Sequence, residues 1–157
     1  MATWQYDLFI IPRKKIEQLG CSGSISEELY DQTQWWKDSA TPQDVASRID
    51  EVLDKGSSWS NSLLTWGVED GNRIDLLLEE NLVSELQVRL DLRNLSEDFL
   101  QQVVDLADSL GGVFCSDDWT LLQPDIQSLA RAMVDSNAAR FVADPLGFLE
   151  NLAGESD

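Results

Sequence analysis

The absence of histidine decides much of the chemistry that this chain can perform. Histidine is the commonest general base near neutral pH, so Ser-His and Cys-His nucleophilic pairs and imidazole metal ligands are excluded. The two cysteines, Cys21 and Cys115, lie far apart and form no C-x-x-C motif, so the sequence predicts neither a zinc site nor a disulfide framework. No glycine-rich segment matches a P-loop or a G-x-G-x-x-G motif. We therefore expect no cofactor and assign no catalytic residue.

Carboxylates are the groups that remain, and two acidic segments could hold a cation. Asp117 and Asp118 suit Mg²⁺ at a phosphoryl-transfer site, but on a strand their side chains would point to opposite faces, and in a turn such residues are common. The run that begins at Asp70 is only superficially like a calcium loop, because Ile74 stands at its fifth position and Asp75 at the position that needs glycine. We predict turns and no metal, and keep Asp117 and Asp118 as candidate partner-binding residues.

Apolar periodicity and capping residues predict the elements that position these groups. Strict alternation over 85–93 indicates a strand with one buried face, and Asp70-Gly71 between two apolar runs indicates a hairpin. Helices are expected to follow Ser26, Thr41 (ending by Gly56), Ser96, Pro124-Asp125 and Asp144-Pro145, each of which is typical of a helix start. Strands are expected over 3–11, 63–66, 73–79, 85–93, 113–115 and 119–122.

This order of elements predicts an α+β fold. We expect an antiparallel sheet of about 4–6 strands with helices packed on one face, resembling a ferredoxin-like (split β-α-β) sandwich with a C-terminal helical extension. Residues 1–157 should form a single domain, because no repeat or long linker divides the chain. Within it, 12–41 is expected to be irregular and rich in loops, and 153–157 to fray.

Composition also bears on location and on partners. No apolar stretch approaches the roughly 20 residues that span a bilayer, and the start of the chain lacks the pattern of a secretory peptide. We expect a cytoplasmic protein with reduced thiols. The chain has 29 acidic and 11 basic residues and a formal net charge of −18, which opposes binding to nucleic acid or to an anionic membrane.

The acidity is uneven, since residues 94–157 hold 12 acidic and 2 basic residues. One interpretation is solubility, or adaptation to a salt-rich cytoplasm. The other is a basic protein partner, because complementary fields raise association rates by orders of magnitude. The sequence leaves the oligomeric state open, including a homodimer through a sheet edge.

Tryptophan supplies the second clue to function. Trp35, Trp36 and Trp59 lie in or beside polar, serine-rich segments, and two adjacent tryptophans do not easily both turn inward. One of the Trp35-Trp36 pair is therefore a candidate for exposure, and all three are candidate partner-binding residues. The alternative is that the pair closes the open face of the sheet. We expect the other strand-borne rings to lie in the core: Trp4, Trp66 and Trp119.

Three classes of function fit these features. The first is a non-enzymatic module that neutralises or regulates a basic protein, similar in charge and size alone to the small immunity proteins that protect bacteria from their own nuclease toxins. The second is a small-ligand-binding domain or a carboxylate-based enzyme with a pocket on the sheet. The third is a decoy that mimics nucleic acid with regularly spaced acids. The first is our hypothesis, and the salt dependence of binding distinguishes the first and third classes from the second.

Overall fold

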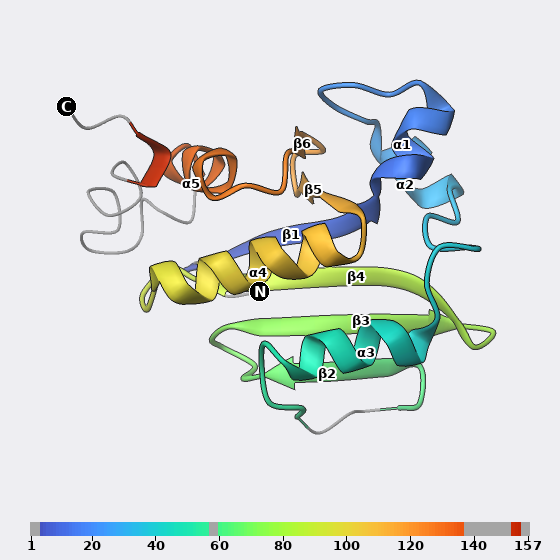
Figure 1. Cartoon of the computed structure of the whole chain (residues 1–157), viewed down its shortest axis with the longest axis horizontal. Coiled ribbons are helices and arrows are strands. Elements are labelled where there is room, and N and C mark those ends of the chain that lie inside the picture. Colours follow the sequence, from blue (N-terminus) through green and yellow to red (C-terminus); the bar gives the residue numbers. More distant parts are fainter. Residues whose placement is uncertain (1–3, 57–59, 137–151, 155–157) are drawn as a thin grey trace.

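The computed structural model describes residues 4–56, 60–136 and 152–154 (Figure 1). Along the chain its elements are β1 (Gln5–Pro12), α1 (Arg13–Leu19), α2 (Glu27–Gln32), α3 (Pro42–Asp50), β2 (Leu63–Gly67), β3 (Arg73–Glu79), β4 (Leu82–Asp91), α4 (Glu97–Ser109), β5 (Gly112–Ser116), β6 (Leu121–Leu122) and α5 (Ile126–Val134). The α+β class is confirmed. The helix expected after Asp144-Pro145 and most of the 153–157 tail lie outside the described residues.

All six strands form one antiparallel sheet in the order β2-β3-β4-β1-β5-β6. Strands β4 and β5 flank β1, each is antiparallel to it, and α4 connects them along the chain. The β2-β3 hairpin extends the sheet beyond β4, and the two-residue strand β6 ends it on the other side. This strand order does not confirm our prediction that the whole chain forms a ferredoxin-like sandwich.

Side-chain oxygens begin four of the five helices in the described part of the chain. Ser26, Thr41, Ser96 and Asp125 each accept a hydrogen bond from the backbone N–H three residues further on, which satisfies a donor that the first helical turn leaves free. These four starts were predicted from the sequence. Helix α1 was not, because only Ile16 of its seven residues is buried and no apolar stripe marks it. The segment 12–41, expected to be irregular, thus contains two short helices.

The strands alternate between an apolar and a polar face. The core face carries residues that are almost completely buried: Leu8, Ile10, Trp66, Ile74, Leu76, Val88, Leu90 and Phe114. Helices α3 and α4 cover this face (Figure 1). Trp66 donates its indole N–H to Asp50 of α3 at 2.7 Å, and a side chain on Gly112 would meet Ala107 of α4. The tertiary core therefore lies between these two helices and the sheet.

The opposite side, which we call the polar face, carries Gln5, Asp7, Thr65, Arg73, Asp75, Gln87, Arg89 and Asp91 at successive registers of β1, β4, β3 and β2. At its β1 end it is covered as well, because Tyr30 of α2 packs on Phe9 with ring centroids 4.9 Å apart. The expectation that helices cover one face only is therefore incomplete. The aromatic contact continues to Trp119, whose ring stacks on Phe9 at 5.9 Å.

Both edges of the sheet are paired with other segments of the chain. At β2, Gly56 donates its backbone N–H to Thr65, and Gly67 donates to Asp54, at 2.8 Å each. This pairing also explains why α3 ends at Asp50 rather than near Gly56. At β6, Leu121 donates to Gly23, and residues 22–25 run beside the strand. Covered edges resist strand addition, so the sheet-edge homodimer considered above gains no support.

Candidate functional site

Trp35 and Trp36 are both buried, each with 2 % of its surface exposed. The expectation that one of them is exposed is therefore wrong. The reason is local: the chain turns at 35–39 instead of running as a strand, so both rings can point inward. Each indole N–H donates to a backbone carbonyl, that of Tyr30 for Trp35 and that of Ile10 for Trp36, at 3.1 and 3.2 Å. Neither ring can contact a partner while this turn is folded. Trp59 lies outside the described residues.

Asp117 and Asp118 form the exposed turn between β5 and β6, as predicted. Asp118 accepts hydrogen bonds from the hydroxyl of Ser116 and from the backbone of Thr120, which lower the pKa of its carboxyl. Partial desolvation, followed by the charge of Asp118, raises the pKa of Asp117. The two aspartates therefore differ in environment, because the pKa of one carboxyl is lowered and that of the other is raised.

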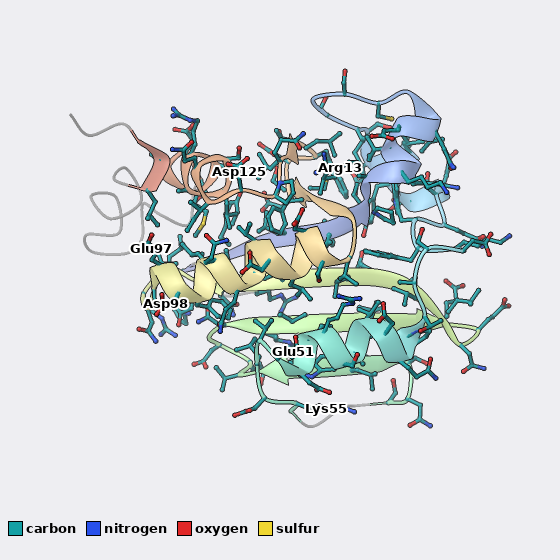
Figure 2. The ribbon with its side chains drawn as sticks, in the orientation of Figure 1. Arg13, Glu51, Lys55, Glu97, Asp98 and Asp125 are labelled. Carbon is teal, nitrogen blue, oxygen red and sulfur yellow. The ribbon has the colours of Figure 1, made fainter. Side chains whose placement is uncertain are left out.

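This turn belongs to a longer acidic stretch of the chain. Residues 94–130 contain no lysine or arginine, and all of their carboxylates are exposed: Glu97, Asp98, Asp105, Asp108, Asp117, Asp118 and Asp125. We call these seven residues the acidic surface. Figure 2 shows Glu97 and Asp98 at the start of α4 and Asp125 at the start of α5. Of the labelled cations, Lys55 lies away from these elements, whereas Arg13 donates its backbone N–H to Gly111, just after α4.

A groove lies between α4 and the start of α5, and three residues of the acidic surface line it. Its volume is about 590 Å³. Asp125 caps α5 through Ser128, at 2.7 Å, and Asp105 accepts a hydrogen bond from Gln101 at 2.9 Å. Charged and apolar groups thus lie side by side along its wall, which includes Val104, Asp105, Asp108, Pro124, Asp125 and Ile126. Such a wall suits a side chain that has an apolar stem and a cationic end.

The polar face contains three aspartate–arginine pairs, which are held with different precision. Asp91 accepts from the backbone N–H, Nε and Nη2 of Arg93 at 2.9–3.0 Å. Asp75 accepts from Nε of Arg73 at 2.8 Å and from the hydroxyl of Thr65 at 3.1 Å. Both pairs are therefore joined by charge-assisted hydrogen bonds.

The third pair, Asp7 and Arg89, is close without being hydrogen-bonded. Nε of Arg89 lies 3.4 Å from Oδ1 of Asp7, and both atoms are buried with no hydrogen-bond partner. Burial raises the pKa of Asp7, although the charge of Arg89 opposes this effect. Alternation over 85–93 predicted polar residues on this side of β4, but the pairing with β1 that brings Asp7 to Arg89 could not be read from local sequence.

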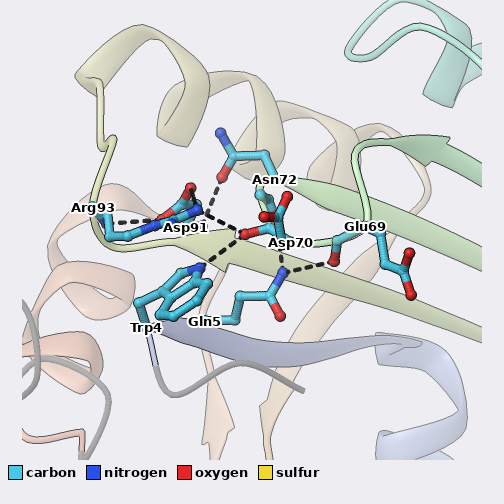
Figure 3. Close-up of polar contacts among 8 residues, drawn as sticks. Trp4, Gln5, Glu69, Asp70, Asn72, Asp91 and Arg93 are labelled. Atoms are coloured by element: carbon cyan, nitrogen blue, oxygen red, sulfur yellow. Dashed lines mark hydrogen bonds and ion pairs between the residues drawn. The ribbon is translucent and has the colours of Figure 1, made fainter.

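The turn of the β2-β3 hairpin is fixed to the same face (Figure 3). The side-chain amide of Gln5 donates to the backbone carbonyls of Glu69 and Gly71, at 3.2 and 2.8 Å, and the indole of Trp4 donates to Asp70 at 2.8 Å. Arg93 reaches the same carbonyl of Asp70 at 2.9 Å and lies 4.0 Å from the ring of Trp4. These contacts explain a polar cluster that sequence analysis did not find, and they give it a structural role.

The other candidate groups show no reactive arrangement. Cys115 is buried, and burial raises the pKa of its thiol to about 12, which disfavours the nucleophilic thiolate. Across residues 4–56, 60–136 and 152–154, no three Cys, Asp or Glu side chains are placed to hold a metal ion. Within those ranges no helix has the length and apolar character needed to cross a membrane.

Comparisons of the chain with protein-family models, with curated proteins and with solved structures find no match.

Proposed function

We propose that the protein is a non-enzymatic binding module whose acidic surface binds and neutralises or regulates a basic protein, in the manner of an immunity protein. The observation that supports this proposal is the run from 94 to 130, in which seven exposed carboxylates are uninterrupted by any cation. Like charges held together in this way cost stability, so a binding role gives a reason for keeping them. Cytoplasmic location, where both free thiols stay reduced, belongs to the same proposal.

Four arginines form ion pairs with aspartates in the described part of the chain. Arg73, Arg89 and Arg93 lie on the polar face beside aspartates, and Arg48 pairs with Asp44 within α3. These four guanidinium groups are held by aspartates that do not belong to the acidic surface, whose seven exposed carboxylates present a negative field to solvent. A basic partner would be attracted along that field, and the attraction would weaken as salt screens it.

The groove indicates how such contact gains specificity. Long-range attraction brings the partner close, and a lysine or arginine side chain can then place its aliphatic stem against Val104 and Ile126 and its charge near Asp105 or Asp108. Substitutions at these aspartates should affect binding more than equal changes of charge elsewhere.

The test is a pull-down from a lysate of the source organism at about 50 mM and about 500 mM salt, with binding of the retained protein then measured on purified material. Wild type is compared with Asp105→Asn/Asp108→Asn. The matched control, Glu51→Gln/Glu79→Gln, removes the same charge from exposed positions on other elements. We expect wild type and control to retain a basic protein at low salt only, and the groove variant to lose most of that binding. Equal binding by both variants, or capture insensitive to salt, would refute the proposal.

A further inference from the structure

Arg73 and Arg89 lie directly opposite each other on β3 and β4. Like charges at facing positions of neighbouring strands destabilise a sheet. The two side chains are nevertheless well buried, with 12 % and 23 % of their surface exposed. One aspartate lies beside each arginine, Asp75 at 2.8 Å from Arg73 and Asp7 at 3.4 Å from Arg89, which allows the two cations to face each other.

The hydrogen bonds of these arginines are incomplete. Arg73 donates from Nε to Asp75, and no bond from its two Nη atoms reaches another described residue. Arg89 donates to none of them, and its Nε is buried without a partner. Arg93, on the same face, uses both Nε and Nη2. Only Nε of Arg89 is fully buried without a hydrogen bond, and it faces Oδ1 of Asp7. The Nη donors of the two arginines remain for an acceptor bound between the guanidinium groups.

We propose that Arg73 and Arg89 form a binding site for a small carboxylate monoanion on the polar face. A guanidinium presents two parallel N–H groups that match the two oxygens of a planar carboxylate. Asp7 and Asp75 balance the charges of the two arginines, so one added negative charge is tolerated, whereas a dianionic phosphate would face both aspartates. Gln87, the neighbour of Asp75 across β3 and β4, adds a half-buried amide beside the arginines.

This site goes beyond the proposed function and does not depend on it. It lies on the polar face, whereas α4, which carries much of the acidic surface, covers the core face (Figure 1). A basic partner bound at the groove beside α4 and a carboxylate bound on the polar face would therefore be separate ligands. Failure of either proposal leaves the other standing, because their variants share no residue.

The experiment is a titration of ¹⁵N-labelled protein with sodium acetate, followed by the Nε–Hε signals of its arginines, with sodium chloride at matched ionic strength as reference. We expect saturable shifts of the Arg73 and Arg89 signals with a dissociation constant on the order of 1 mM, and a weaker response to phosphate. The variant Arg89→Lys keeps the charge but loses the planar fork, and should weaken binding about tenfold. Arg93→Lys is the matched control and should bind as wild type does.

Each outcome is decisive. Saturable shifts with acetate that Arg89→Lys weakens and Arg93→Lys leaves unchanged would establish the site. Non-saturating shifts equal to those in chloride would show that the two arginines only stabilise the sheet, and would overturn the proposal. Equal affinity in wild type and Arg89→Lys would overturn it too, since binding would then need charge alone. Tighter binding of phosphate than of acetate would contradict the choice of a monoanion.

Discussion

A carboxylate on the polar face takes its character from the hydrogen bonds it receives. Asp91 accepts three from Arg93, whereas Asp7 has Arg89 at 3.4 Å and no hydrogen bond to its buried Oδ1. Burial without compensation favours the neutral form of an acid. The charges of Asp117 and Asp75 act in the same direction on Asp7. The weakest of the three aspartate–arginine pairs is therefore the one that should respond to pH.

Asp7→Asn tests this response through the stability of the fold. The pKa of Asp7 is raised above its ordinary value of 3.8, so the folded protein holds this proton more tightly than the unfolded chain does. The free energy of unfolding of wild type should then fall as pH rises from 3.8 through the raised pKa. Asp7→Asn has no carboxyl at this position, so its free energy of unfolding should lack this decrease. Measured by urea denaturation, the difference between variant and wild type should increase with pH over this window. A difference that decreases would mean that Arg89 outweighs burial.

Only some of the candidate site residues had an environment that could be predicted from the sequence. The turn at Asp117-Asp118 was predictable, because adjacent aspartates between two short apolar runs are common in turns. The burial of Trp35 and Trp36 was not, since it depends on a tight turn and on carbonyls of Tyr30 and Ile10 that accept from the two rings. Local patterns give the conformation of a segment more readily than the environment into which tertiary packing brings it.

At the scale of elements, capping residues predicted where most of the helices begin. The hydroxyl of Ser96 accepts from the backbone N–H of Phe99 at 3.1 Å and begins α4, the longest helix described. Ser96→Ala removes this acceptor and should lower the free energy of unfolding by about 1 kcal/mol, measured by urea denaturation. Ser39→Ala, at an exposed turn position where the hydroxyl makes no bond to a described residue, is the matched control and should change it little. Equal effects would show that α4 is held by packing alone.

Strands were predictable one by one, but their order in the sheet was not. Alternation over 85–93 and the Asp70-Gly71 turn placed β4 and the β2-β3 hairpin correctly. Nothing local indicated that β1 would lie between β4 and β5, or that 54–56 and 22–25 would cover the sheet edges. These pairings join residues far apart in the chain. The Arg73–Arg89 pair illustrates the consequence, because it exists only once β3 and β4 are aligned in register.

At the scale of the whole molecule, the net charge of −18 opposes folding, and its distribution decides where that cost can be relieved. The acidic surface concentrates repulsion on α4, the β5-β6 turn and the start of α5, in a stretch of sequence that contains no lysine or arginine. Salt should stabilise the protein by screening this repulsion. A surface kept for binding, rather than for stability, should be improvable by removing charge.

Asp105→Asn/Asp108→Asn separates these two roles in a single variant. At about 20 mM salt its melting temperature should exceed that of wild type, because the variant has two fewer negative charges on the acidic surface. At about 500 mM salt the two melting temperatures should be nearly equal, because salt then screens the repulsion in wild type as well. Calorimetry at the two salt concentrations measures both effects. The same variant should bind the basic partner less well, so stability and binding would move in opposite directions. If it were less stable than wild type at low salt, Asp105 and Asp108 would be structural residues, and lost binding could no longer be assigned to the surface itself.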